Sequence, residues 1–282
     1  MTILGEIIDK LPTVKEQHAR DSRIYNDLKA EARREVENLF SSLEVKPIEF
    51  PPFGTLVFPY HKMGAIDSLN LFDLDELIIF SFYWQNRKRY KKVADIGSNI
   101  GLHSILLSKC GYDVRCYEPD PETFKVLQRN LKLNNCSSVA PFNAAVSSKP
   151  GEMEFIRVLG NITGSHLAGS KADPYGELVK FPVKVEGIGP IIEWADFIKL
   201  DAEGHEKEIV LATDREQWKK TDAMIEVENK DNAAALFAHF TNLGINMFAQ
   251  KINWRKVNKI DDMPAGYKNG SLFVSSKKEM PW

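Results

Sequence analysis

The sequence predicts an α/β fold in which a mostly parallel sheet carries helices on both faces, preceded by an N-terminal helical extension. From about residue 91 onward, short apolar segments alternate with helix-like ones, which is the pattern of strand–helix–strand units. Gly97 and Gly101 follow the first of these apolar segments, where a strand would turn into a helix. The 282 residues, 43% hydrophobic, are enough to bury the core of one large domain or of a domain with an extension.

Residues 1–45 are highly charged and read as helical. Their apolar residues recur at helical spacing and form one stripe, which must pack against another surface: Ile24, Leu28, Ala32, Val36, Leu39, Phe40 and Leu43. The rest of the chain and a second subunit are both open as that surface, so a homodimer through the N-terminal helix is one expected arrangement. The proline-rich segment 46–54 interrupts the helix. We therefore expect an extension over 1–55 and the main domain over 56–282.

The main domain is expected to open with a helix over 71–85, which Asp73 caps and for which Glu76 completes a capping box. Hydrophobic periodicity then predicts the alternating elements. The seven expected strands of the sheet are 91–97, 113–119, 138–147, 194–204, 222–229, 245–251 and 271–276, and the helices between them are 99–111, 120–135, 205–214 and 231–244. A β insert is expected over about 147–186, with strands 151–158 and 178–186 around a loop rich in glycine and serine.

Composition and charge exclude several classes of partner. With a net charge of −2, the chain lacks the excess of basic residues that is typical of nucleic-acid-binding proteins. The longest apolar run, 76–84, is under half of the ~20 residues needed to cross a bilayer, and the charged N-terminus is unlike a signal peptide. Cys110, Cys116 and Cys136 match neither a zinc site nor a redox pair, which favours reduced thiols in a cytoplasmic protein.

The glycine turn at 97–101 predicts a ligand without a phosphate. A dinucleotide fingerprint needs Gly-x-Gly-x-x-Gly, but Asn99 occupies its middle glycine position, which disfavours a dehydrogenase. The chain also has no Gly-Lys-Ser/Thr of a Walker loop. Asp95, Gly97 and Gly101 remain, and they suit a zwitterionic ligand. Gly97 would let the ligand lie against the backbone, and Asp95 would act on its ammonium group directly or through water.

Glu118 ends the second expected strand, 23 residues after Asp95. This is close to the spacing of ~20 residues at which an acid meets ribose hydroxyls in nucleotide-binding folds. Its two carboxylate oxygens match two adjacent hydroxyl donors. The alternative is that Glu118 only caps the helix that follows.

These elements, taken in order, resemble the class I S-adenosylmethionine-dependent methyltransferases, whose sheet is seven-stranded and Rossmann-like. In that family the end of strand three flanks the adenine, here Asn143 and Ala144. The fourth strand resembles the FkbM family, whose Lys-x-Asp-x-Glu-Gly-x-Glu signature is met by Lys199, Asp201, Glu203, Gly204 and Glu206. The resemblance covers about 90–275. The cofactor-binding residues it implies are Asp95, Gly97, Ser98, Asn99, Gly101, Glu118, Asn143, Ala144 and Asp201.

The resemblance implies methyl transfer from S-adenosylmethionine to a hydroxyl of a sugar, glycan or secondary metabolite, although some members methylate nitrogen. An alcohol needs a base to take its proton, and Asp201, Glu203, His205 and Glu206 cluster where one is expected. Helix capping is the alternative role for these acids. Asp201 with Glu228 and Asn229 loosely echoes the Mg²⁺ site of catechol-type enzymes, so Mg²⁺ stays an alternative. A non-catalytic scaffold that binds the cofactor is the rival from another class.

Overall fold

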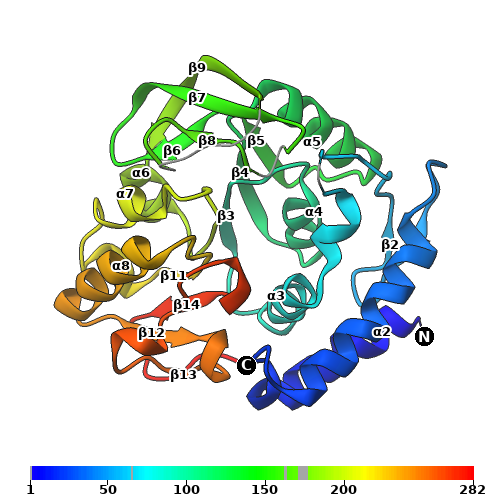
Figure 1. Ribbon diagram of the computed structural model, residues 1–282, viewed down its shortest axis with the longest axis horizontal. Helices are drawn as coiled ribbons and strands as arrows, with labels where there is room; N and C mark the ends of the chain where they lie inside the picture. The colour runs from blue at the N-terminus through cyan, green and yellow to red at the C-terminus, as the bar shows by residue number, and fades with distance from the viewer. Residues whose placement is uncertain (1, 65, 162–163, 171–176) are drawn as a thin grey trace.

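The computed structural model describes residues 2–64, 66–161, 164–170 and 177–282. Its main sheet has eight strands in the order β13-β12-β14-β11-β10-β3-β4-β5 (Figure 1). The parallel strands are β3 (Lys92–Ile96), β4 (Asp113–Tyr117), β5 (Val139–Phe142), β10 (Phe197–Leu200) and β11 (Asp222–Ile225). Beyond them lie β14 (Leu272–Ser275), β12 (Asn246–Ala249) and β13 (Arg255–Lys256) in antiparallel pairings.

The α/β architecture is confirmed, but the expected strand count of seven is wrong. The eighth strand is β13, which has two residues and pairs with β12 at the edge of the sheet. Asn253 and Trp254 both have positive φ, at 58°, and reverse the chain between the two strands. So short a strand leaves no periodic pattern in the sequence.

Helices cover both faces of the sheet, as predicted. On one face lie α3 (Leu74–Gln85), α4 (Leu102–Lys109) and α5 (Pro121–Leu133), and on the other α6 (Ile188–Trp194), α7 (Glu206–Val210) and α8 (Lys230–Leu243). Each face has its own hydrophobic cluster, and neighbouring strand residues alternate between them. Val93 points into the first cluster and Ala94 into the second. The sheet is therefore buried on both sides, and only its ends are open to a ligand.

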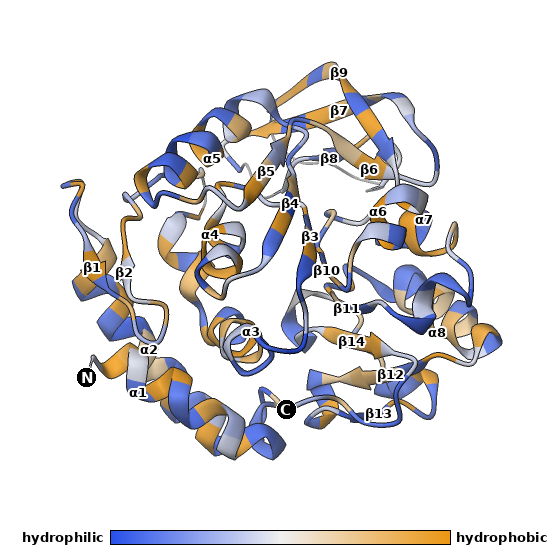
Figure 2. Cartoon of the chain, turned by 180° about the vertical axis from the view of Figure 1, so that it is seen from behind, coloured by the Kyte–Doolittle hydropathy of each residue, from blue (hydrophilic) through white to orange (hydrophobic). Residues whose placement is uncertain are grey.

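The N-terminal segment packs on the first of these faces. It consists of α1 (Ile3–Lys10), a 3₁₀ turn (Leu11–Gln17) and α2 (Arg23–Phe40). The apolar side of α2 is buried in the same cluster as α3, and Figure 2 shows apolar and polar residues alternating along this helix. Leu43 lies beyond the end of α2 and is 80% exposed. The stripe thus packs on its own chain, and the expected homodimer and the boundary at residue 55 stay predictions.

Short elements join α2 to α3 and follow the later strands. A hairpin of β1 (Ile48–Glu49) and β2 (Thr55–Leu56) precedes a 3₁₀ turn. Among the described residues, the 3₁₀ turns after α2 include Ser68–Phe72, Gln217–Lys219, Gln250–Ile252, Ile260–Asp262 and Tyr267–Asn269. Across the described part of the chain, none of the helices has both the length and the apolar composition that crossing a bilayer requires.

The insert forms a second sheet at one end of the molecule, beside β4 and β5 (Figure 1). Its order is β6-β9-β7-β8, with β6 (Ala145–Ser147), β7 (Gly151–Leu159), β8 (His166–Leu167) and β9 (Glu177–Gly187). The expected third strand, 138–147, is therefore wrong as one element, because it divides between the two sheets at Asn143 and Ala144. Parts of the glycine- and serine-rich loop, 162–163 and 171–176, lie outside the described residues.

Candidate active site

The sheet brings a glycine and three acidic residues together where its strand order reverses. After β3 the chain moves outward to β4 and β5, then returns to place β10 on the other side of β3. Ile96 pairs with both Tyr117 and Leu200, and Leu200 pairs with Ile225. The next residues, Gly97, Glu118, Asp201 and Glu226, therefore lie side by side at the carboxyl edge, where open α/β sheets bind their ligands.

The turn after β3 has a backbone that only certain residues tolerate. Gly97 has a φ of 78°, and a Cβ there would lie 1.7 Å from the carbonyl oxygen of Asp201. Asn99 also has a left-handed φ, of 49°, a conformation for which asparagine is one of the better residues. Its side-chain oxygen accepts a hydrogen bond from the amide of Ile100. This explains how Asn99 makes a tight turn where a dinucleotide fold has glycine.

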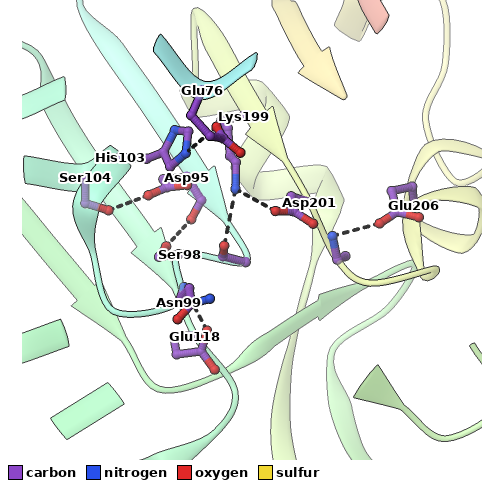
Figure 3. A network of polar contacts seen from close by, with 12 residues as sticks. Glu76, Asp95, Ser98, Asn99, His103, Ser104, Glu118, Lys199, Asp201 and Glu206 are labelled. Carbon is purple, nitrogen blue, oxygen red and sulfur yellow. Dashed lines mark hydrogen bonds and ion pairs between the residues drawn. The ribbon is translucent and has the colours of Figure 1, made fainter. Parts of the chain in front are cut away.

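Glu118 faces this turn from the end of β4 (Figure 3). Its Oε2 accepts the amide hydrogen of Asn99 at 3.0 Å and its Oε1 accepts that of Asp120 at 2.9 Å. The residue is only 7% exposed, and burial raises the pKa of its carboxyl to about 8, more than the two backbone amides lower it. Each oxygen keeps a lone pair for a further donor. Glu118 can therefore bind two ligand hydroxyls.

A narrow pocket beside Glu118 holds five of the predicted cofactor-binding residues: Gly97, Asn99, Glu118, Ala144 and Asp201. The insert forms its opposite wall through Phe155, Ser165, His166 and Leu167. Sequence reasoning placed His166 in a segment that could cover the site, but missed Phe155, Ser165 and Leu167. Their one signal was the insert's position in the chain, directly after the expected third strand.

The other four predicted cofactor residues shape the turn instead of lining the pocket. Asp95 is fully buried and accepts a hydrogen bond from Ser104. The Ser98 hydroxyl donates to the Asp95 carbonyl and accepts from the Tyr117 amide. Gly101 is the N-cap of α4. Asn143 is exposed and donates to the carbonyl oxygens of Glu118 and Pro119. In this geometry, Asp95 is therefore not placed to contact a ligand directly.

A larger cavity of about 990 Å³ adjoins the pocket. It is bounded by the carboxyl ends of β10 and β11, by α3, and by Arg20 and Lys29 of the N-terminal segment. Asn99, Asp201 and Glu203 line both hollows. A ligand in the narrow pocket and a second ligand in the cavity would thus meet at these three residues. Below, "the junction" means Asn99, Asp201 and Glu203.

Charged side chains cluster on the cavity side of the junction (Figure 3). Lys199 Nζ donates to Asp201 Oδ2 at 3.1 Å and to the Gly97 carbonyl at 3.4 Å. Burial alone would lower the pKa of Lys199, but the carboxylates around it, Asp201 foremost, raise the pKa. The charge of Asp201 and burial raise the pKa of Glu226 well above its usual range. Lys199 is therefore a permanent cation, with Asp201 as its partner.

His205 and Glu206 line neither hollow. Both ring nitrogens of His205 are engaged, Nε2 by Ser147 at 2.9 Å and Nδ1 by Ser170 at 3.0 Å, and burial lowers its pKa. Glu206 accepts the amide hydrogens of Ala202 and Gly204 and the side-chain amide of Asn232. Burial raises the pKa of Glu206 to about 7. Both residues brace the loop after β10, which holds Asp201 and Glu203 at the junction.

The Mg²⁺ alternative has no support in the geometry. Asn229, one of its three residues, caps α8 by accepting the Asn232 amide hydrogen at 2.9 Å. Among the residues that the structure describes, no three His, Cys, Asp or Glu side chains are grouped to hold a metal ion.

Comparison with known proteins identifies the family. The sequence model of the methyltransferase FkbM domain matches residues 95–250, more than half of the chain. The chain therefore belongs to the FkbM methyltransferase domain family. The match includes the glycine turn, Glu118 and the junction, and excludes α3 and the N-terminal segment.

Relatives and solved structures of methyltransferases are similar to the chain. "Methyltransferase sdnD" of Sordaria araneosa is 26% identical in an alignment of length 162 that covers 45% of this chain and 61% of that protein. "Methyltransferase 1" of Beauveria bassiana (strain ARSEF 2860) is 22% identical in an alignment of length 155 that covers 47% of this chain and 62% of that protein. The chain thus spans about three fifths of these relatives. A SAM-dependent methyltransferase from Agrobacterium tumefaciens is similar with a TM-score of 0.44 and 8% identity, over 83% of this chain and 71% of that one.

Proposed function

We propose that the chain transfers a methyl group from S-adenosylmethionine to a hydroxyl of a sugar, glycan or secondary metabolite. One observation carries this proposal: the narrow pocket and the larger cavity share the three residues of the junction in their walls. Methyl transfer is an in-line displacement and needs donor and acceptor to be aligned from two sides. Two hollows that share the same three wall residues provide that arrangement.

The residues of the narrow pocket fit the adenosine part of the cofactor. Ala144, Phe155 and Leu167 offer an apolar slot for a base, and Glu118 offers a carboxylate to the ribose hydroxyls. At Gly97 the missing side chain makes room for the carbonyl oxygen of Asp201, which brings the loop after β10 against the glycine turn beside the pocket. When bound, the cofactor supplies an electrophilic methyl group on a sulfonium.

Asp201 or Glu203 is the base in this proposal. Both line the cavity as well as the pocket, so either can accept the proton that an acceptor hydroxyl loses as its oxygen forms the new bond to carbon. His205 and Glu206, the other two predicted bases, are held in hydrogen bonds outside both hollows. Lys199 holds the Asp201 side chain at the junction, because it donates a hydrogen bond to that carboxyl group.

The wall chemistry of the cavity supports a hydroxylated acceptor. Carboxylate oxygens accept hydrogen bonds from hydroxyls, and the cavity wall includes Asp73, Asp75, Glu76 and Glu228 besides the junction acids. Nitrogen acceptors are the second candidate, because an amine would also donate to these carboxylates.

The test is transfer of labelled methyl from S-adenosylmethionine into small-molecule, glycan, protein and RNA fractions of an extract. We expect label in the small-molecule or glycan fraction, and its loss in Glu118→Ala. Label in protein or RNA would overturn the substrate class. Cofactor binding without transfer into any fraction would favour the scaffold alternative, and no binding at all would overturn the proposal.

A further inference from the structure

Glu76 does not play the capping role that its position predicts. Asp73 caps α3 by accepting the amide hydrogen of Leu74, and the Glu76 side chain turns instead toward β3 and the cavity (Figure 3). The side chain is 27% exposed. Glu76 precedes the family match at 95–250, so family membership assigns it no role.

A buried pair of side chains fixes the position of the Glu76 carboxylate. His103 Nε2 lies 3.0 Å from Glu76 Oε2, and His103 Nδ1 lies 2.9 Å from the hydroxyl of Tyr83. Burial raises the pKa of Tyr83 well above its usual range, so its hydroxyl stays protonated and anchors the His103 ring at Nδ1. The other side of the His103 ring lies against Glu76 Oε2. The second oxygen of Glu76 stays available to a ligand.

Lys199 supplies the opposite charge in the same cavity wall. Its Nζ lies at the glycine turn, where it donates to Gly97 and Asp201. An ammonium group has three donors, so one remains for a ligand. Glu76 is among the carboxylates that raise the pKa of Lys199, which shows that the two groups are near each other. The wall therefore offers one anion and one cation a short distance beyond Asn99.

We infer that Glu76 and Lys199 hold the amino-acid end of the cofactor. The Glu76 carboxylate pairs with the ammonium of the ligand, and the Lys199 ammonium pairs with its carboxylate. This inference rests on the proposed function and assigns a second binding site for the same cofactor. Asp95, the residue first expected to meet the ammonium, is fully buried and bonded to Ser104. Its place in the wall is taken by Glu76.

The proposed place of the adenosine part directs the cofactor's tail toward the cavity. The narrow pocket ends at the junction, and Glu118 and the apolar slot account for the adenosine part alone. The tail must then pass Asn99 and enter the cavity, whose wall next to Gly97 contains Lys199 and Glu76. A zwitterion is bound best where opposite charges face its two ends. Glu76 as the proton-accepting base is the competing role, and it predicts a loss of turnover without a loss of affinity.

The test compares two ligands by calorimetry: S-adenosylhomocysteine, which has the amino-acid tail, and 5′-methylthioadenosine, which lacks it. We expect Glu76→Gln to weaken the binding of S-adenosylhomocysteine roughly ten- to hundredfold, since a charge-assisted contact is lost. The affinity for 5′-methylthioadenosine should stay within about twofold, below the cost of one ordinary hydrogen bond. Lys199→Gln should show the same selective loss. Glu37→Gln, an exposed glutamate of α2, is the matched control and should change neither affinity.

His103→Asn tests the positioning role of the histidine, because the shorter side chain cannot reach Glu76. It should lower the affinity for S-adenosylhomocysteine by a smaller factor than Glu76→Gln does. The affinity for 5′-methylthioadenosine should stay unchanged. Equal loss of both ligands in Glu76→Gln would mean a structural role and would overturn the inference. So would equal affinities of the unaltered protein for the two ligands, or turnover lost at constant affinity. If the unaltered protein bound neither ligand, the proposed function itself would fail.

Discussion

The α-carbon of Gly97 lies so close to the carbonyl oxygen of Asp201 that an added Cβ would come within 1.7 Å of it. The two residues follow neighbouring strands, β3 and β10, at the same level of the sheet. This contact between backbones lies at the narrow pocket, whose wall includes both residues. It also ties the glycine turn to the loop that carries Asp201 and Glu203.

We predict that Gly97→Ala abolishes ligand binding and strongly destabilises the protein, because backbone cannot move aside as a flexible side chain would. Gly111→Ala is the matched control. Gly111 has a similar φ of 87°, but an added Cβ would meet nothing within 4 Å. The control should lose only the ~1–2 kcal/mol of left-handed strain. Chemical denaturation of both variants measures the difference, and equal losses would mean that strain alone fixes Gly97.

Glu118 should make cofactor affinity dependent on pH. Its pKa is about 8 before a ligand binds, and ribose hydroxyls need the ionised carboxylate as acceptor. Below pH 8, binding must therefore release the proton of Glu118, so affinity should rise as pH rises from 6 toward 8. The upper bound is tenfold per pH unit, the limit for one linked proton.

Glu118→Gln should bind S-adenosylhomocysteine roughly tenfold or more weakly and lose this pH dependence. Calorimetry between pH 6 and 8, in two buffers of different ionisation enthalpy, measures both the affinity and the protons released. Because the ligand's own groups titrate equally in both proteins, the difference between them belongs to Glu118. Parallel pH curves for the two proteins would contradict the assignment.

Asp201→Asn should lower turnover far more than cofactor affinity. The amide keeps the size of the side chain and a hydrogen bond from Lys199, but it cannot take a proton. General base catalysis contributes ~10²–10⁴-fold, so we expect a loss of kcat in that range with affinity changed by less than about threefold. Glu203→Gln distinguishes the other base, and the exposed Glu208→Gln is the control. If neither Asp201→Asn nor Glu203→Gln lowered kcat, the base would lie elsewhere.

The site could be predicted from sequence where local rules set the geometry. Alternating strands and helices place the residues after Ile96, Tyr117, Leu200 and Ile225 at one edge, and Glu118 follows from its spacing. Asn99 and Gly97 follow from the turn. Such positions follow from where each strand ends and from the turn after it, which the local sequence indicates.

The remaining positions depend on packing between distant segments. Capping rules place Glu76 at the start of α3, but nothing local indicates that His103 lies opposite it. Asp95 has the position of a ligand-binding acid, yet Ser104 from the next helix turn covers it. The pocket wall of Phe155 and Leu167 depends on how the insert folds back over β4. No periodicity in the sequence encodes these contacts.

Arg157 joins the insert to Asp120 beside the narrow pocket. From β7, its Nε and Nη2 each donate a 2.6 Å hydrogen bond to the carboxylate of Asp120. Asp120 is buried, lines the pocket beside Glu118, and caps α5 by accepting the amide hydrogen of Glu122. The two-pronged geometry requires a guanidinium, since an ammonium cannot form both bonds in one plane.

We predict that Arg157→Lys lowers the free energy of unfolding by about 1–3 kcal/mol, the range for a hydrogen bond to a charged group. It should also weaken the binding of S-adenosylhomocysteine, because the pocket wall that the insert forms would move relative to Glu118. Lys180→Met is the matched control on the same insert: Lys180 lies 3.2 Å from Glu154, but both side chains are about half exposed. That surface pair should contribute under ~1 kcal/mol and leave binding unchanged. Equal behaviour of the two variants in thermal unfolding and calorimetry would show that the Arg157–Asp120 pair does not position the pocket wall.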